Sequence, residues 1–431
     1  MYKNKIIKMS LAIVTGLTLT PNAFADDASE IAALKKEVAE LRKMTQALLK
    51  HTQITNKKSE EKIAVLEETQ QTLIDETSNI QTGFTSVSDG HSHSGMGTAA
   101  SKVYYSKSPL SIGGYGEMMY SSQTGDSTNE DKIDFYRFVP YIGYKFSDNI
   151  ILNTEIEFEH GGVTDDGIAQ GGAVVLEFFY LDFLFNDNFN LRAGNFLVPM
   201  GLINEKHEPT LFNTVQRPDT ERFIVPSTWG EAGIMAYGDI TEGVSYNFAA
   251  ISALKTATNG SKWIRNGRTG TERQTDPGFA MVGRLDYTGV NGLLLGTSTY
   301  LDTDMRISDI HLDYKVGGAR AYGIYTDVSR SNAQNIAPDA VDSASGGYLN
   351  LSYDVLSLTN STHSLPVFIQ YEAYNPEDSR ADGTSGDATK ITTLGINYFP
   401  HEQVVLKLDY AMKEKANIKD DIASVSMGFI F

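Results

Sequence analysis

The sequence predicts an all-β transmembrane protein: an antiparallel β-barrel of about sixteen strands, preceded by an N-terminal α-helical coiled coil. Three observations predict the barrel. From residue 110 onward, apolar and polar residues alternate, as in strands with one apolar face. Most alternating segments are close to the roughly 9–11 residues that a tilted strand needs to cross a bilayer. Tight turns and longer connections follow one another between these segments, which is the asymmetry of a membrane-spanning barrel.

The composition narrows the classes of partner and chemistry. The 431-residue chain contains no cysteine, which excludes disulfides and thiolate metal sites. Its formal net charge of −18 disfavours nucleic acid as a partner, because duplex binding needs a basic face. One large barrel accounts for most of the length without a second globular domain.

Residues 1–25 are predicted to be a secretory signal peptide. Three lysines precede a short apolar stretch over 9–20, and a small-x-small site follows at Ala23–Ala25. The apolar stretch is too short for a transmembrane helix. We therefore expect cleavage after Ala25 and export of the mature chain.

Residues 26–82 carry a heptad pattern that predicts a periplasmic coiled-coil stalk. The a and d positions of its first part are Ile31, Leu34, Val38, Leu41, Thr45 and Leu48. The pattern resumes after a shift of four residues, a stutter that loosens a supercoil, at Ile63, Leu66, Leu73 and Ile80. A stalk that self-associates and a helix that lies on another surface both fit this pattern.

Residues 83–104 are rich in glycine and serine and lack an apolar period, which predicts a flexible linker. His91 and His93 lie within it. Two histidines without a third ligand make a poor metal site, so we expect a spacer and no bound metal or other cofactor.

The barrel is predicted to occupy residues 105–431. Its even strand number is what a bacterial outer-membrane barrel requires. The predicted strands are 110–121, 132–146, 149–160, 173–185, 188–198, 231–240, 242–252, 278–288, 291–302, 306–316, 319–329, 345–357, 365–375, 389–399, 402–412 and 421–431.

The connections are predicted to differ at the two ends of the barrel. Tight turns alternate with long connections at 161–172, 199–230, 253–277, 330–344, 376–388 and 413–420. Aromatic residues such as Tyr398 and Phe399 gather beside the tight turns, where an interfacial girdle belongs. The chain stops on Phe431, at the end of an alternating strand. We expect Phe431 to face outward at the interface and to act as a signal for the outer-membrane assembly machinery.

A barrel of sixteen strands is too wide to be filled by its own side chains, so an aqueous lumen is expected. The predicted wall is mostly acidic, and its glutamates are expected to stand in wide water. The residues assigned to the lumen wall are Arg137, Lys145, Glu155, Glu157, Glu159, Arg192, Arg284 and Lys315.

The connection 199–230 is the candidate pore constriction. Pro199 and Gly201 end the preceding strand and permit a sharp fold. A connection this long in a compact barrel is usually functional. An external lid and a contact between subunits remain alternatives. Its candidate site residues are Glu205, Lys206, His207, Glu208, Arg217, Asp219, Glu221 and Arg222.

The stretch from Arg192 to Pro218, followed by "PSTWGEAGIMAYG", resembles the third-loop region of the phosphate-selective porin O/P family. With its stalk, the chain is more similar to the trimeric DcaP-like porins of that group. The resemblance implies a homotrimer in the outer membrane that passes small anionic solutes.

The predicted function is therefore passive diffusion of small hydrophilic solutes, such as phosphate or carboxylates, through a porin of a Gram-negative outer membrane. Lipid, the assembly machinery and other copies of the chain are its expected partners. A non-selective or cation-preferring porin is one alternative, and a barrel-anchored adhesin or tether is another. No enzyme is expected, because no G-x-S-x-G or H-E-x-x-H motif occurs.

Overall fold

A computed structural model describes the barrel over residues 92–162, 172–256 and 260–431. It also describes parts of the stalk, namely 35–36, 38–52, 55, 57–59, 62–63 and 66. The predicted signal peptide lies outside the described residues. The chain divides into two compact units, Met1–Ile74 and Asp75–Phe431.

The N-terminal unit is helical at each of its described positions. Val38, Leu41 and Leu48 of the heptad pattern are exposed, so the described residues of the N-terminal unit do not cover these three positions. The hydroxyl of Thr45, a polar residue in the stripe, donates to the Leu41 carbonyl oxygen at 2.8 Å within the same helix. The predicted helix is present, and its association with other copies stays a prediction. Among the helices that the structure describes, none is long and apolar enough to span a membrane.

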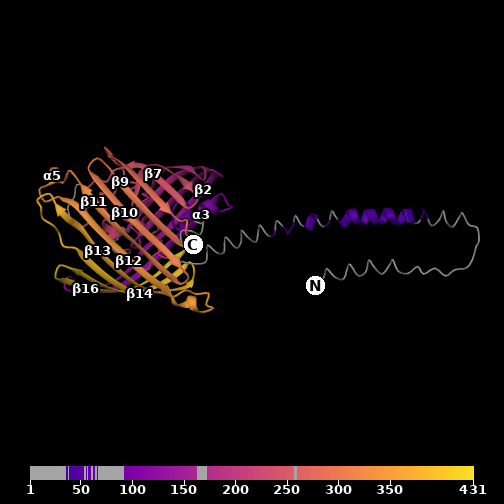
Figure 1. Cartoon of the computed structure of the whole chain (residues 1–431). Helices are drawn as coiled ribbons and strands as arrows, with labels where there is room; N and C mark the ends of the chain where they lie inside the picture. The colour runs from indigo at the N-terminus through magenta and orange to yellow at the C-terminus, as the bar shows by residue number, and fades with distance from the viewer. Residues whose placement is uncertain are drawn as a thin grey trace, which may run out of the picture. The chain divides into compact units, whose positions relative to one another are not determined.

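In the second unit, the described residues form a closed barrel of sixteen antiparallel strands (Figure 1). Their number and order agree with the prediction. The strands are β1 (Leu110–Gly125), β2 (Glu130–Ser147), β3 (Ile150–Glu159), β4 (Ala173–Asn186), β5 (Phe189–Leu197), β6 (Gly230–Thr241), β7 (Val244–Ser252), β8 (Phe279–Tyr287), β9 (Leu293–Leu301), β10 (Met305–Val316), β11 (Ala319–Arg330), β12 (Val341–Asp354), β13 (Pro366–Arg380), β14 (Thr389–His401), β15 (Val404–Lys415) and β16 (Ile418–Ile430).

Short helices complete the unit. They are α3 (Thr98–Tyr105), η2 (Asn204–Lys206), α4 (Thr220–Phe223), η3 (Arg265–Gly267), α5 (Ala333–Ile336) and η4 (Val355–Leu358).

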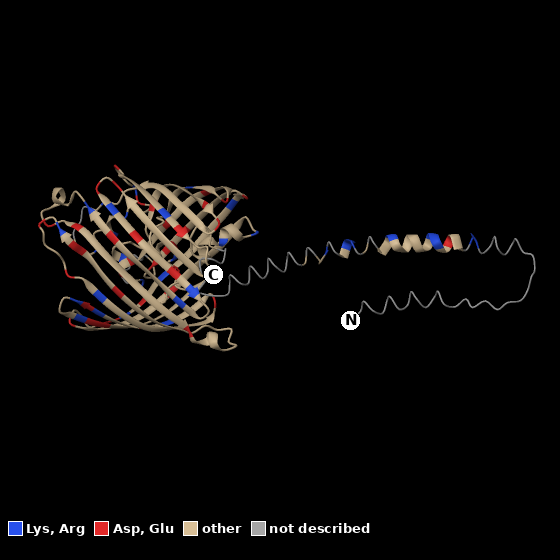
Figure 2. Ribbon diagram, in the orientation of Figure 1, with Lys and Arg blue, Asp and Glu red and all other residues tan. Residues whose placement is uncertain are grey.

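The wall has an apolar outer face and a polar inner face. On β15, Leu406 and Leu408 are 43% and 51% exposed, whereas Lys407 between them is 1% exposed. Lysine and arginine are interspersed with aspartate and glutamate along the strands (Figure 2). This arrangement inverts that of a soluble protein and is typical of a wall that faces lipid outside and water inside.

The first and last strands of the barrel, β1 and β16, close the sheet. β1 pairs with β16 from Tyr115 opposite Ile430 to Gly125 opposite Asp420. Phe431 extends the pairing, because its backbone N–H and carbonyl oxygen bond to Gly114 at 2.9 and 3.0 Å. A Cβ on Gly114 would lie 2.8 Å from the Phe431 ring, so the glycine makes room for that ring. The barrel therefore has no unpaired edge at this seam.

Two connections differ from the prediction. The connection 413–420 is a tight turn at residues 416–417, because Lys413 pairs with Asp420 and Glu414 with Lys419 and these opposite charges extend the ladder. At the other end, β12 and β13 are joined by η4 and a longer segment, 355–365. The asymmetry of the connections is therefore less regular than expected. Phe399, assigned to the girdle, instead faces inward and is buried.

Within the predicted linker, residues 92–104 are ordered against the barrel wall, whereas 83–91 lie outside the described residues. Helix α3 buries Ala99, Ala100 and Val103. The Asn153 side-chain amide donates to the Ala100 carbonyl oxygen at 2.8 Å. The small residues that suggested flexibility let the helix approach the strands closely. On the wall side, Gly143 of β2 contributes to the close approach, because a Cβ there would lie 2.4 Å from Val103.

Candidate functional site

The connection 199–230 enters the barrel directly after β5. Gly201, with φ +71°, supplies the turn. The Gly201 carbonyl oxygen accepts from Arg284 of β8 at 2.7 Å, and its N–H donates to Asp309 of β10 at 3.2 Å. Inward-facing wall residues therefore hold the start of the loop inside the barrel.

The middle of the loop reaches the wall near β15. Lys407 donates from Nζ to the Phe212 and Thr214 carbonyl oxygens at 2.8 and 3.0 Å. The Val215 N–H donates to Asp409 Oδ2 at 2.7 Å. Wall side chains thus satisfy the polar backbone groups of a buried loop, as burial requires.

The returning part of the loop carries α4 and is fixed by carboxylates. Glu221 Oε2 accepts the N–H groups of Leu202 and Ile203 at 2.9 and 2.7 Å, which joins the two ends of the loop. Burial raises the pKa of Glu221, and these hydrogen bonds oppose the rise. Asp219 Oδ2 accepts from the Tyr374 hydroxyl at 2.9 Å and from Lys413 at 3.0 Å. The contacts are those of a fixed internal loop.

The turn 205–208 meets helix α3. Glu208 Oε1 accepts the N–H groups of Ala99 and Ala100 at 3.0 and 3.1 Å, at the start of that helix. Glu205 Oε2 lies 3.4 Å from Arg284 Nη1. Burial lowers the pKa of Lys206 to about 8, although Asp313 partly opposes it. A helix N-terminus favours a carboxylate, so Glu208 stabilises this contact.

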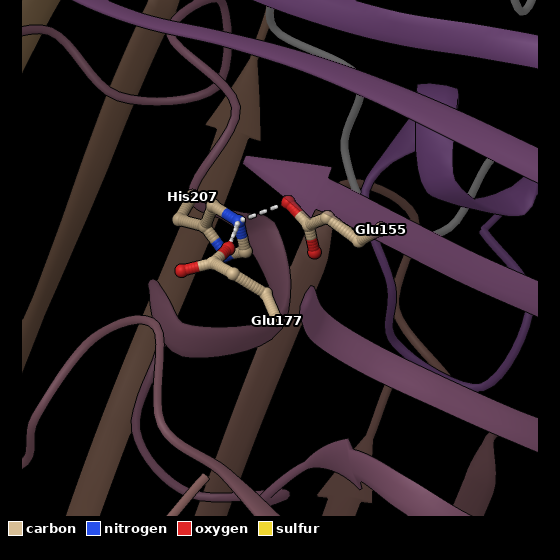
Figure 3. Close-up of side chains that lie close together, drawn as sticks. All are labelled: Glu155, Glu177 and His207. Carbon is tan, nitrogen blue, oxygen red and sulfur yellow. Dashed lines mark hydrogen bonds and ion pairs between the residues drawn. The ribbon is translucent and has the colours of Figure 1, made fainter. Parts of the chain in front are cut away.

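His207 points at two wall glutamates (Figure 3). Its Nε2 lies 3.1 Å from Glu155 Oε1 on β3 and 3.5 Å from Glu177 Oε2 on β4. Its Nδ1 lies 2.7 Å from the carbonyl oxygen of Asn204. Burial by itself would lower the pKa of His207, but Glu155 and then Glu177 outweigh burial and raise it. This cluster joins the loop to the wall.

The residues assigned to the lumen wall all belong to inward-facing positions, and several form ion pairs there. Arg137 lies 2.9 Å from Glu117, and Arg192 lies 2.9 Å from Asp182. Arg284 Nε lies 2.7 Å from Asp286. Lys145 instead donates to two carbonyl oxygens at 3.0 and 2.7 Å. Lys315 and Glu159 are half-buried.

The expectation that the wall glutamates stand in wide water is wrong for two of them. Glu155 is fully buried and Glu157 is 3% exposed. For Glu155 the reason is the inserted loop, whose His207 covers this carboxylate.

Three arginines bond to Ser227, and a fourth, Arg222, accepts from one of them through its carbonyl oxygen at 3.4 Å; we call the four the arginine cluster. Its members are Arg217, Arg222, Arg265 and Arg268. Arg265 and Arg268 donate to the Ser227 carbonyl oxygen at 3.3 and 3.0 Å, and Arg217 donates to the Ser227 hydroxyl at 3.2 Å.

The arginine cluster is short of counter-ions. Arg222 pairs with Asp219 at 3.1 Å, but no carboxylate of the described residues forms an ion pair with the other three. Burial, and then the neighbouring Arg268 and Arg222, lower the pKa of Arg265 to about 10. The cluster is therefore a concentration of positive charge that an anion would relieve.

Opposite charge lies nearby on the wall. Burial lowers the pKa of Arg268, while Glu177, Glu157 and Glu159 oppose that shift electrostatically. The barrel interior thus holds cations from two loops beside glutamates of β3 and β4.

Comparison with known proteins gives a relative. No known protein-family model matches the chain. An uncharacterized protein of Aquifex aeolicus (strain VF5) is 34% identical over 375 residues, covering 79% of this chain and 84% of that protein. The chain belongs to the family of this Aquifex protein.

Solved structures of other proteins resemble this chain in fold. OmpF of Salmonella typhi, in a complex with daunomycin, aligns with a TM-score of 0.54 at 12% identity, over 75% of this chain and 97% of that one. The outer membrane channel DcaP of Acinetobacter baumannii aligns with a TM-score of 0.52, also at 12% identity and with the same coverage. The barrel is therefore of the architecture found in outer-membrane porins.

Every charged residue of the loop 199–230 was predicted as a site residue, whereas Glu177 of the wall was not. Glu177 lies in a strand whose apolar and polar residues alternate poorly, so the sequence pattern did not show that its side chain faces inward. Arg265 and Arg268 belong to the connection after β7, whose basic character was visible in the sequence. Their meeting with Arg217 depends on how two loops fold, which local patterns do not encode.

Proposed function

We propose that the protein is a porin of a Gram-negative outer membrane, a passive diffusion channel for small hydrophilic solutes. The loop 199–230 forms the constriction. The observation that carries the proposal is the fixed position of this loop inside a closed barrel, with the arginine cluster beside it. Bonds to wall residues of several strands hold the loop in one place, as a constriction requires.

The proposed solutes are small anions such as phosphate or carboxylates. Guanidinium groups present planar donors that match the oxygens of both. The arginine cluster supports an anion path because three of its members lack a carboxylate partner among the residues described. The resemblance to the phosphate-selective porin O/P family points the same way.

A cation-preferring channel is the second candidate. The full chain carries a formal charge of −18, and Glu155, Glu157 and Glu159 follow one inward face of β3. Charges in a narrow region of low dielectric weigh more than charges in open water. Screening over about 8 Å at physiological salt weakens distant wall charges. We therefore expect the cluster to decide selectivity.

Reversal potentials across a salt gradient in planar bilayers test this proposal. Changing Lys206, Arg217 and Arg222 to Ala should shift selectivity toward cations by several-fold. Changing Glu155, Glu157 and Glu159 to Gln is the matched wall variant, and it should shift selectivity less and in the opposite sense.

Three outcomes are informative. A loop variant that leaves the reversal potential unmoved, beside a wall variant that moves it strongly, would favour the cation-preferring channel. Purified protein that does not conduct would favour a barrel-anchored adhesin or tether. Conduction with the expected pair of shifts supports the anion channel.

The assembly is also part of the proposal. We propose a homotrimer whose helices associate as a periplasmic coiled coil. The exposed stripe of Val38, Leu41 and Leu48 supports this, because an isolated helix has nothing else to cover it. Phe431 serves as the assembly signal at the closing seam.

A further inference from the structure

We infer that Glu155, Glu177 and His207 form a binding site for one divalent transition-metal cation, such as Zn²⁺, between the loop and the wall. The three ligand atoms lie within 4.8 Å of one another. They come from β3, β4 and the inserted loop (Figure 3). The inference concerns binding alone and does not depend on what the barrel transports.

The hydrogen bonding of His207 is the first argument. Its Nδ1–H donates to the Asn204 carbonyl oxygen at 2.7 Å, which directs Nε2 at the two carboxylates. A metal-binding imidazole is usually oriented by such a bond to its second nitrogen. Carboxylates only accept, so an unprotonated Nε2 facing them needs a cation in between. A proton on Nε2 is the competing solution.

The carboxylate atoms are the second argument. Glu155 is fully buried, and the Glu177 side chain is 6% exposed. Within the described part of the chain, Glu177 Oε2 makes no hydrogen bond and has only the 3.5 Å ion pair to His207 Nε2. The second oxygen of Glu155, Oε2, makes no hydrogen bond either. Buried carboxylate oxygens without partners are costly unless a cation compensates them.

The backbone of β4 is built to place Glu177 here. Glu155 pairs with Phe178 and the next residue, Ile156, pairs with Leu176, so Glu177 is the extra residue of a β-bulge. Successive residues of a regular strand face opposite ways. The bulge turns both Glu177 and Phe178 inward, and bulges commonly direct a side chain into a site in this way.

The distances suit a small metal ion. Zn²⁺ bonds of about 2.0–2.2 Å give tetrahedral ligand–ligand edges of about 3.3–3.6 Å. The observed separations from Nε2 are 3.1 and 3.5 Å. One imidazole and two carboxylates suit Zn²⁺ or a similar cation better than Mg²⁺ or Ca²⁺, which prefer oxygen ligands alone. The remaining position is left to water.

Titration of the metal-free full-length protein in detergent with Zn²⁺ tests the site. We expect one Zn²⁺ per chain, binding that weakens as pH falls, and release of the His207 proton on binding. Mg²⁺ should bind at least tenfold more weakly. The melting temperature should rise with Zn²⁺, because the ion joins loop to wall.

Variants assign the ligands. His207→Gln and Glu177→Gln should each weaken Zn²⁺ binding tenfold or more and remove the rise in melting temperature. Glu159→Gln is the matched control, on the same strand as Glu155 but outside the three, and it should bind as the wild type does. Binding that is equal in the control and the His207→Gln variant would overturn the inference. A wild-type protein that binds no Zn²⁺ would also overturn the inference, and this measurement does not depend on the folding of any variant. In that case His207 is an imidazolium ion that pairs with both glutamates.

Discussion

At the residue scale, Lys206 gives the proposed constriction a charge whose pKa is about 8. Burial lowers its pKa to about 8, from an ordinary value of about 10.5. Because the folded pKa lies below the unfolded one, the charged form is disfavoured in the fold. Stability linked to this lysine therefore increases as pH rises from about 8 to about 10.5, while the positive charge of the loop decreases.

We expect the reversal potential of the wild type to move toward cation preference between pH 7 and pH 9. In this window the charged fraction of Lys206 falls from about nine-tenths to about one-tenth. Lys206→Arg is the control. Its guanidinium stays charged over this pH range, so the variant should show little of the shift in reversal potential. Equal shifts in both proteins would mean that another group titrates.

At the element scale, helix α3 and the loop 199–230 depend on one another through Glu208. This carboxylate accepts two N–H groups at the first turn of α3, and its Oε2 has no partner among the described residues. Burial raises the pKa of Glu208, while the bonds from Ala100 and Ala99 oppose the rise. A Cβ on Gly97 would lie 2.3 Å from Glu208 Oε1, so the glycine permits this approach.

Removing the carboxylate should loosen the start of α3. Leaving buried donors unsatisfied costs about 1–3 kcal/mol. We expect Glu208→Ala to speed amide hydrogen exchange at Ala99 and Ala100 by about tenfold or more, while Glu208→Gln, which keeps an acceptor, has a smaller effect. Amides in the β10–β11 ladder should exchange unchanged. Unaltered protection at both alanines in the Ala variant would show that packing alone holds α3.

At the scale of the whole molecule, the alternating pattern predicted the barrel well because a lipid-facing wall enforces it residue by residue. β15 ends later and β16 begins earlier than predicted, since charge pairs between them replace apolar contacts there. The interior was less accessible to prediction. Glu177 faces inward through a bulge, and Lys407 bonds to loop carbonyls 193 and 195 residues away in the chain. Sequence patterns report local periodicity, whereas the site is made of contacts between distant segments.

The closing seam gives a prediction about assembly. The backbone of Phe431 makes two hydrogen bonds with Gly114. Its ring stacks on that of Phe138, with the ring centroids 6.1 Å apart. Deleting Phe431 should sharply reduce the amount of heat-modifiable barrel in the outer membrane. Phe431→Tyr, which keeps the ring, should assemble nearly normally. A deletion variant that accumulates like the wild type would remove Phe431 from the proposed assembly signal.

The stalk gives the last prediction, on the oligomer. Val38, Leu41 and Leu48 are exposed on the described part of the helix, yet Thr45 and Thr52 occupy positions in the stripe. Both threonines bond to their own helix, so we expect the stripe to be a weak determinant of association. Removing residues 29–82 should leave a conducting barrel and weaken the trimer, seen as lower-mass species by native mass spectrometry after dilution. The isolated 26–82 peptide provides the complementary measurement. It should become helical and associate as its concentration rises, because the helices must cover each other's apolar stripe. A peptide that stays monomeric and unfolded at high concentration would leave trimerisation to the barrel walls alone.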